Sequence, residues 1–349
     1  MYKIRSLSAV AVALLLAACS GRPSLSPSAS SPPLLYIHED TLFQQAPSGT
    51  LERLTDLPRM GKVLAATVSD DTVLVLREEG LQRVYLTTGA ADMVVRFDVP
   101  ARSGLIMPMA DGSRVLYSVM VRDADAHFSV GTRIGLYQAG KEEAALYFAY
   151  DAQALGVTTD GRGLYIVPRG EDSSFGRLLV VSLDKGETES EQAVQGLVPA
   201  ALSPDSRYLA MTTIRHATPD EREDVLAVYD LASQPLTPRE VAYPHTPSHT
   251  RWLVWSPDSR FLYFVLWSSH SWDDPTESGG LWRFDVKLGQ LSQETVVSEP
   301  QMWPRLVSPD GQWLLLQHES KGLAIIVHLP TGATESLTLP IMAVAAGWR

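Results

Sequence analysis

The sequence predicts an all-β fold built from repeated units of four strands, and three observations lead to this prediction. First, a short apolar segment, a turn containing Asp and a second apolar segment recur, with the turn Asp at residues 71, 111, 160, 205, 258 and 310. Second, segments that favour β-hairpins follow most of these turns. Third, incomplete units stand at the two ends of the repeated region and together supply one more unit.

The turn repeat is clearest in three copies, at 202–209, 255–262 and 307–314, and each of them contains Ser-Pro-Asp. Weaker copies surround Asp111 and Asp160, and the weakest surrounds Asp71. The turn Asp residues are 40, 49, 45, 53 and 52 residues apart, which is the size of one four-stranded blade of a β-propeller. Because an Asp side chain bonds to its own backbone in a turn, we interpret the repeated Asp as a turn residue rather than a catalytic one.

The hairpin segments end in Thr-Gly, Lys-Gly or Leu-Gly, and they occupy residues 84–89, 180–186, 282–289 and 326–332. Glycine suits such turns because it adopts positive φ angles without strain. Each unit is therefore expected to supply an inner strand, a second strand after the Asp turn, and an outer hairpin.

The ends of the chain decide the number of blades. Six full units run from about residue 63 to 338, and the segments 34–38, 41–44 and 51–55 read as the last three strands of another blade. The segment 341–348 reads as an inner strand without its continuation. Pairing the two fragments closes the ring and leaves no exposed sheet edge. We therefore favour seven blades closed by the N- and C-terminal strands, with six blades as the alternative.

The repeats resemble the Ser-Pro-Asp-Gly repeats of TolB-type β-propellers, and the resemblance covers most of the chain from about residue 34. Two of the clearest copies depart from the pattern, with Ser206 and Ser259 where Gly is usual. The resemblance implies a propeller of the cell envelope that docks other proteins. TolB itself has six blades and is soluble rather than lipidated.

The N-terminus reads as an export signal over residues 1–18. Lys3 and Arg5 precede an apolar run from Ala9 to Ala18, and this run is too short for a membrane span, which needs roughly 20 residues. The four residues that end at Cys19, Leu-Ala-Ala-Cys, resemble the lipobox of bacterial lipoproteins. The resemblance implies cleavage before Cys19 and attachment of diacylglycerol and a further acyl chain, such as palmitate, to this residue. Cys19 is the only cysteine, so it has no intramolecular disulfide partner.

Residues 19–33 are rich in Ser and Pro and read as a tether, and residues 34–349 form the propeller. We therefore expect an extracytoplasmic, membrane-anchored protein. In a Gram-negative host it would lie on the periplasmic face or, as Ser20 permits, at the outer membrane. In a Gram-positive host it would lie on the outer face of the cell membrane.

The charge of the chain limits its partners. Removing residues 1–18 takes away two basic residues and leaves 27 basic against 40 acidic residues, a net charge of −13. The phosphates of nucleic acids would be repelled by this charge, and so would anionic lipid headgroups. The lipid on Cys19 must therefore provide the membrane attachment, and no nucleic-acid partner is expected.

Three long connections between second and third strands carry the candidate binding residues. Each contains one His among carboxylates, and the candidates are Asp123, Asp125, His127, His216, Asp220, Asp224, His270, Trp272, Asp273 and Asp274. Such side chains are possible ligands of a divalent cation, but their spacing matches no metal-binding motif. We predict no metal site and no other cofactor.

The sequence contains no Gly-x-Ser-x-Gly, Walker A or His-Glu-x-x-His motif, and no catalytic residues are assigned. Seven of the eight Trp lie between Trp252 and Trp313. Trp272 lies in a predicted loop and is a candidate contact for a glycan or protein partner, whereas we expect Trp255, Trp282 and Trp313 to pack between blades. The predicted function is non-enzymatic binding of a cell-envelope protein or surface glycan. The alternative is a propeller enzyme that acts on an extracytoplasmic carbohydrate or peptide.

Overall fold

The computed structural model describes residues 31–46, 49–109, 113–122, 130–138, 140–168, 176–194, 197–218, 221–233, 235–241, 243, 248–250, 252–268, 279–299, 301–318 and 320–349. The unit from Ser31 to Arg349 is all-β, and no helix occurs among these described residues. The predicted signal sequence, Cys19 and the predicted tether up to residue 30 lie outside them.

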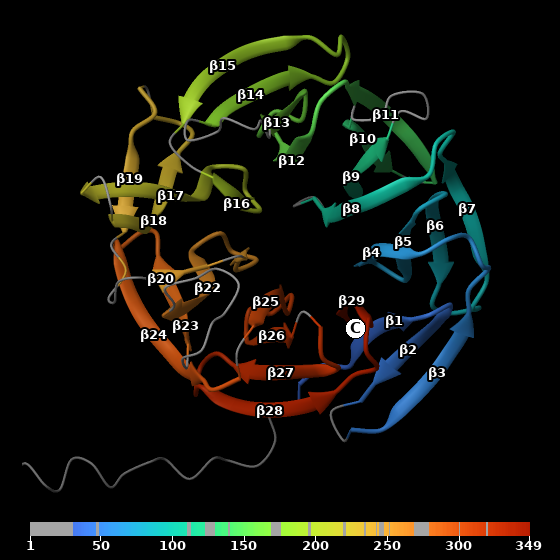
Figure 1. Ribbon diagram of the computed structural model, residues 1–349. Coiled ribbons are helices and arrows are strands. Elements are labelled where there is room, and N and C mark those ends of the chain that lie inside the picture. Colours follow the sequence, from blue (N-terminus) through green and yellow to red (C-terminus); the bar gives the residue numbers. More distant parts are fainter. Residues whose placement is uncertain are drawn as a thin grey trace, which may run out of the picture. The chain divides into compact units, whose positions relative to one another are not determined.

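Seven antiparallel sheets surround a common axis as the blades of a β-propeller (Figure 1). Blade 1 joins the two ends of the chain, in the order β29 (Val344–Trp348), β1 (Leu34–His38), β2 (Thr41–Gln45) and β3 (Leu51–Asp56). Blade 2 contains β4 (Val63–Ser69), β5 (Thr72–Arg77), β6 (Gly80–Tyr85) and β7 (Ala91–Arg96). Blade 3 contains β8 (Ala101–Pro108), β9 (Arg114–Arg122), β10 (Val130–Gln138) and β11 (Lys141–Phe148).

The remaining four blades follow in chain order around the ring. Blade 4 contains β12 (Ala152–Val157), β13 (Gly163–Pro168), β14 (Gly176–Ser182) and β15 (Thr188–Val194). Blade 5 contains β16 (Leu197–Leu202), β17 (Tyr208–Thr218), β18 (Glu221–Asp230) and β19 (Pro238–Val241). Blade 6 contains β20 (Ser248–His249), β21 (Leu253–Trp255), β22 (Phe261–Ser268), β23 (Gly279–Asp285) and β24 (Gln290–Val297), with β20 and β21 both paired to β22. Blade 7 contains β25 (Met302–Val307), β26 (Trp313–His318), β27 (Leu323–His328) and β28 (Ala333–Thr338).

The prediction of seven blades is confirmed, and so is closure by the two ends of the chain. β29 pairs antiparallel with β1, and Leu34 lies opposite Trp348. The Arg349 N–H donates to the Pro33 carbonyl oxygen at 2.9 Å. Pro33 and Arg349, at the two ends of the propeller, thus lie where the other blades have the Asp turn. The last strand begins at Val344 rather than at Ile341, because Pro340 and Ala343 form a backbone hydrogen bond that turns the chain just before it.

The core consists of seven apolar clusters, one between each pair of neighbouring blades. The middle strands are buried on both faces, as the pattern of β26 shows, whereas the outer strand β11 alternates between exposed and half-buried residues. This gradient follows from the fold, since each middle strand lies between two other blades and each outer strand faces solvent on one side. Burial between blades is therefore the main source of stability.

One buried polar group also joins the closing blade to its neighbour. The Arg77 side chain is fully buried, and its Nη1 donates to Asp40 Oδ1 at 2.8 Å and to the Gly61 carbonyl at 2.9 Å. Its Nε donates to Gln82 Oε1 at 2.7 Å. Asp40 belongs to blade 1 and Arg77 to blade 2, so this ion pair connects the blade that closes the ring to the next one.

Candidate functional site

The two ends of the propeller are built from different connections. In an antiparallel blade, the turns after the first and third strands lie at one end, which we call the turn face. The connections after the second strand and those between blades lie at the opposite end, which we call the connection face. The lengths and contacts of the connections differ between these two faces, so each is described in turn.

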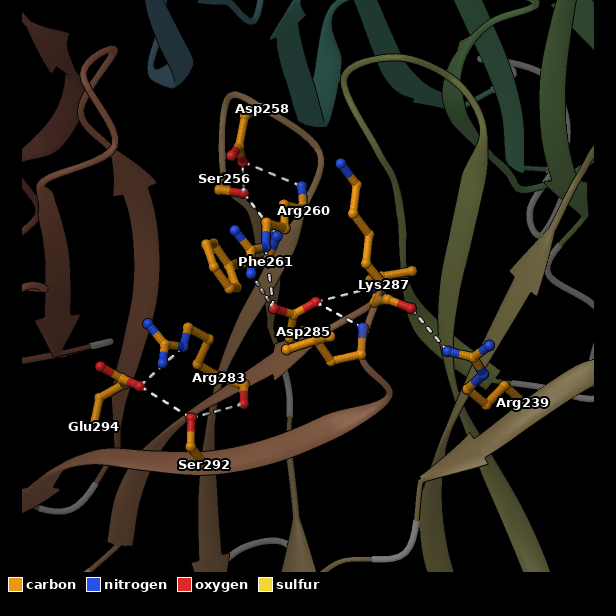
Figure 2. Close-up of polar contacts among 12 residues, drawn as sticks. Arg239, Ser256, Asp258, Arg260, Phe261, Arg283, Asp285, Lys287, Ser292 and Glu294 are labelled. Carbon is orange, nitrogen blue, oxygen red and sulfur yellow. Dashed lines mark hydrogen bonds and ion pairs between the residues drawn. The ribbon is translucent and has the colours of Figure 1, made fainter.

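The turn face is held by a repeated set of hydrogen bonds around the turn Asp. In blade 6, the Ser256 hydroxyl donates to Asp258 at 2.6 Å, and the same carboxylate accepts the Arg260 N–H at 3.2 Å (Figure 2). The Ser256 oxygen in turn accepts the Phe261 N–H at 2.8 Å. Equivalent bonds form around Asp205 and Asp310, and around Asp160 with Thr in place of Ser. The turn role of these four Asp residues is therefore confirmed.

The two Ser residues that replace the usual Gly link neighbouring blades. Ser206 and Ser259 both have a φ of 59°, a left-handed conformation that favours Gly. The Ser206 hydroxyl donates to the Val157 carbonyl of blade 4 at 2.7 Å, and the Ser259 hydroxyl accepts the Asp205 N–H of blade 5 at 3.0 Å. At each of these two positions, a hydrogen bond of the Ser hydroxyl to a neighbouring blade thus offsets the strain of a backbone conformation that favours Gly.

An Arg–Asp pair supports the turn in blades 5 and 6. Arg260 Nη2 lies 2.8 Å from Asp285 Oδ2, and its guanidinium carbon lies 4.7 Å from the centre of the Phe261 ring (Figure 2). Arg283 approaches the same ring at 4.7 Å. Blade 5 repeats the pair with Arg207 and Asp230 at 2.9 Å.

The carboxyl of Asp285 is held in its charged form. Burial raises its pKa, but hydrogen bonds from the Leu288 N–H and the Arg260 guanidinium act together to bring the pKa below its usual value. The Lys287 N–H also donates to this carboxylate, at 2.9 Å. The polar groups of this turn are thus used within the propeller, and they stabilise the turn.

The Trp residues on strands have the expected role between blades. Trp255 is buried, its ring stacks on Tyr208 of blade 5 at 6.2 Å, and its Nε1 donates to the Ala201 carbonyl at 3.1 Å. Trp313 is buried in the cluster between blades 7 and 1, and Trp282 packs against the cluster between blades 5 and 6. The prediction for these three residues is confirmed.

Most of the predicted binding residues fall outside the described part of the chain. Asp123, Asp125, His127, Asp220, His270, Trp272, Asp273 and Asp274 belong to this group. His216 and Asp224 lie on β17 and β18, opposite Arg222 and Ile214 respectively. The expectation that these two residues lie in a long connection between the second and third strands is therefore wrong, because the two strands pair almost to the end of the hairpin. No group of three metal-ligating side chains occurs among the described residues.

The connection face carries exposed apolar residues that the sequence did not single out as a site. Nine large apolar side chains are exposed among the described residues, and five of them lie just before the innermost strand of a blade: Val99, Tyr150, Trp252, Ile341 and Met342. By contrast, Leu288 is the one member of this group within a connection of the turn face. Each of the five lies one to three residues before an innermost strand, so together they line the inner rim of the connection face.

Two features of the backbone and side chains fix parts of this rim. The guanidinium carbon of Arg305, on the innermost strand of blade 7, lies 4.3 Å from the centre of the Trp252 ring, which precedes the innermost strand of blade 6. Met342 has a φ of 67°, a strained conformation for a residue other than Gly, and its side chain is 66% exposed. The concentration of Trp in the C-terminal half of the sequence could have indicated Trp252 as a residue of this rim, but no sequence pattern indicated Met342.

Comparison with solved structures shows the propeller fold. The chain is similar to TolB from Acinetobacter baumannii at 13% identity, with a TM-score of 0.51, covering 92% of this chain and 68% of that one. It is similar to Kuenenia stuttgartiensis hydrazine synthase at 10% identity, with a TM-score of 0.52, covering 92% and 99%. It is also similar to an acylaminoacyl peptidase from Pyrococcus horikoshii at 13% identity, with a TM-score of 0.56, covering 85% of this chain but 48% of that one. No protein-family model matches the chain, and no curated protein sequence matches it.

In the part of the chain that the structure describes, there is no helix of the length and hydrophobicity that membrane crossing requires.

Proposed function

We propose that this chain is a lipid-anchored, extracytoplasmic β-propeller that binds another macromolecule of the cell envelope through its connection face. The observation that carries this proposal is the difference between the two faces. On the turn face, Asp and Ser side chains bond within the turns and between blades, which leaves them committed to structure. On the connection face, apolar side chains are exposed on the inner rim. Exposed apolar groups that gather on one surface are typical of interaction sites.

The lipid anchor rests on the N-terminal sequence. A basic start, a short apolar run and the Leu-Ala-Ala-Cys motif at Cys19 support cleavage and lipidation. Two acyl chains suffice for stable membrane attachment, since each buried CH₂ contributes about 0.8 kcal/mol. The tether would then connect to the turn face, because β1 begins there beside the end of β29. The connection face is at the opposite end of each blade from the point at which the chain enters β1.

The anchor is tested by the substitution Cys19→Ser. We expect loss of radiolabelled palmitate incorporation and release of the protein from the membrane fraction, with an unchanged far-UV circular dichroism spectrum. Substitution of the adjacent residue, Ser20→Ala, serves as the matched control and should leave lipidation intact. Membrane association that survives Cys19→Ser would contradict the proposed anchor.

The binding role is tested by photo-crosslinking in the native cell. A benzophenone amino acid is placed at position 342 on the connection face and at position 288 on the turn face, two sites that are 66% and 62% exposed. We expect a specific crosslinked neighbour from position 342 and none from position 288. Absence of any neighbour at position 342 would count against a binding role for this face.

A further inference from the structure

A buried histidine lies at the connection face, at the end of a middle strand of blade 7. His318 is the last residue of β26 and is 3% exposed. Its side chain lies on the same side of β26 as Leu314 and Leu316, because alternate residues of a strand share a face, and those two residues pack in the cluster between blades 6 and 7. Histidine ordinarily gains its proton between about pH 5 and 8, so the contacts of this ring determine how acid acts on the connection face.

The Nδ1 atom of His318 accepts two backbone hydrogen bonds. The Ser320 N–H donates to it at 3.1 Å and the Lys321 N–H at 3.0 Å. A ring nitrogen accepts hydrogen bonds only while it carries no proton, so these bonds require a neutral ring with its proton on Nε2. In the protonated ring both nitrogens are donors, and Nδ1 would face two N–H groups with which it forms no bond. Protonation therefore breaks the contacts that hold Ser320 and Lys321 in place.

The glycine that follows Lys321 contacts the segment that precedes β29. The Gly322 carbonyl oxygen accepts the Leu339 N–H at 2.8 Å. A Cβ atom at Gly322 would lie 2.1 Å from the Leu339 carbonyl oxygen and 3.3 Å from the Ile341 nitrogen, so the two backbones are in direct contact. The position of Gly322, which depends on the His318 contacts just before it, therefore supports the position of Leu339 and Ile341.

A second contact holds the other end of this segment. Gln317, the residue just before the buried histidine, donates from Nε2 to the Ala343 carbonyl oxygen at 2.8 Å. Between the two contacts, Met342 keeps a φ of 67°, a strained conformation for a residue other than Gly. Such strain persists only while the surrounding contacts enforce it. The segment 339–343 is therefore expected to relax when the contact with Gly322 is lost.

Two charged side chains of the described residues lie beside His318. Lys321 and Glu299 form an ion pair. The hydrogen bond from Lys321 lowers the pKa of Glu299 below its usual value, and positive charge on Lys321 and on His318 lowers it further. The neighbouring strand ends on this face, residues 264–268, 279–282 and 302–304, contain no charged residue. Glu299 is thus close enough to favour a proton on the His318 ring.

We infer that protonation of His318 releases the segment 339–343 and so changes the exposed rim of the connection face in acid. With a neutral ring, the Nδ1 contacts hold Gly322, and Gly322 holds the segment that exposes Ile341 and Met342. With a protonated ring, the first of these contacts is lost and the strained segment relaxes. The inference concerns the folded chain itself, and it rests on the proposed function only for its consequence, namely that a partner bound to this rim would dissociate in acid.

The inference is tested by hydrogen exchange of the full chain in detergent, resolved to single residues, at about pH 8 and about pH 5. Each rate is divided by the intrinsic rate at that pH, which removes the direct effect of pH on exchange. We expect the protection of the Ser320, Lys321 and Leu339 amides to fall roughly tenfold or more in acid, because two hydrogen bonds are lost together. The Leu329 amide is the matched control, since it donates to the Gln312 carbonyl at 2.8 Å on the turn face of the same blade, and it should keep its protection.

Two substitutions separate the ring proton from other effects of acid. His318→Asn keeps an oxygen that can accept the two N–H groups and does not titrate in this range, so the protection of the three amides should be the same at both pH values. His318→Ala removes the acceptor, and protection should be low at both. Circular dichroism at about pH 8 checks the fold of each variant. If His318→Asn does not fold, the comparison with Leu329 in the unsubstituted chain decides alone.

Three results would overturn the inference: unchanged protection in acid, an equal fall at Leu329, or the same fall in folded His318→Asn. The inference and the proposed function fail separately. A crosslinked neighbour at position 342 in cells, together with unchanged protection in acid, would leave the binding role standing and refute the release by His318. The expected exchange without any neighbour in cells would refute the binding role and leave the release by His318 intact.

Discussion

Replacement of Trp348 by Ala is expected to lower the free energy of unfolding by the full cost of truncating a buried aromatic residue. Trp348 is 5% exposed, lies opposite Leu34 across the junction of the chain ends, and packs in the cluster between blades 7 and 1. Truncation of a fully buried Phe or Trp to Ala costs about 3–5 kcal/mol, because apolar contact is lost and a cavity remains. A domain is typically stable by about 5–15 kcal/mol, so this single change should remove a large part of the total.

The assay is urea unfolding of the full chain at 25 °C, followed by far-UV circular dichroism. Trp252→Ala is the matched control, because this Trp is 37% exposed and its contact with Arg305 is worth about 0.5–1 kcal/mol at such a site. Hydrogen exchange should also become faster in β1, which loses packing at its paired strand. A loss of about 1 kcal/mol or less for Trp348→Ala, which is the cost expected for the control, would refute the role of β29 in closing the ring.

Three further predictions concern groups inside the propeller. Ser206→Ala should lower the free energy of unfolding by about 1–2 kcal/mol, because the hydrogen bond to Val157 is lost while the strain of the positive φ angle remains. Ser206→Gly should lower it less, and the opposite order of the two variants in urea unfolding would contradict this account. The pKa of Asp285 is lowered in the folded protein, so its contribution to stability is present above the unfolded pKa of about 4 and is lost as the pH falls through the folded pKa. Asp285→Asn should therefore reduce the free energy of unfolding at pH 7 and have less effect in acid, and an equal effect at both pH values would contradict this. Burial raises the pKa of Tyr263 to about 12, so the free energy of unfolding should fall as the pH rises from about 10 towards 12. Tyr263→Phe should reduce that fall, as measured by urea unfolding at several pH values alongside a spectrophotometric titration of the phenol.

The blade count could be predicted from the sequence because each blade repeats a short local signal. The Asp turn and the glycine hairpin depend on the backbone preferences of neighbouring residues, and their spacing of 40 to 53 residues fixes the size of the unit. The strands from Leu34 to Asp56 and the last strand up to Trp348 were also recognisable as parts of one blade. Their pairing followed from the need to leave no open sheet edge.

The features that depend on distant contacts could not be predicted. The Ser206 hydrogen bond to Val157 joins residues 49 positions apart in different blades. The local sequence therefore showed that Ser replaces the usual Gly, but it did not show the hydrogen bond that compensates for the backbone strain. Extension of β17 and β18 through His216 and Asp224 depends on continued pairing across the hairpin, which the charged composition of that segment concealed.

The rim of the connection face was missed for a related reason. Ile341 and Met342 are apolar and adjoin a strand, so their sequence reads as a continuation of that strand into the core. The structure instead places a turn between Pro340 and Ala343, which exposes both side chains. Whether an apolar residue is buried is decided by such turns rather than by residue type.

The pairing of β29 with β1 sets the order in which the protein can mature. The two strands are separated by nearly the whole length of the propeller in sequence, so blade 1 stays incomplete until the segment 344–348 is available to pair with β1. Contacts between residues so far apart in sequence form slowly, because the entropic cost of closing a long loop precedes the stabilisation by strand pairing. During that interval β1 presents an unpaired edge, and such an edge can pair with another chain, so the rate of closure by β29 limits the time in which this association can occur.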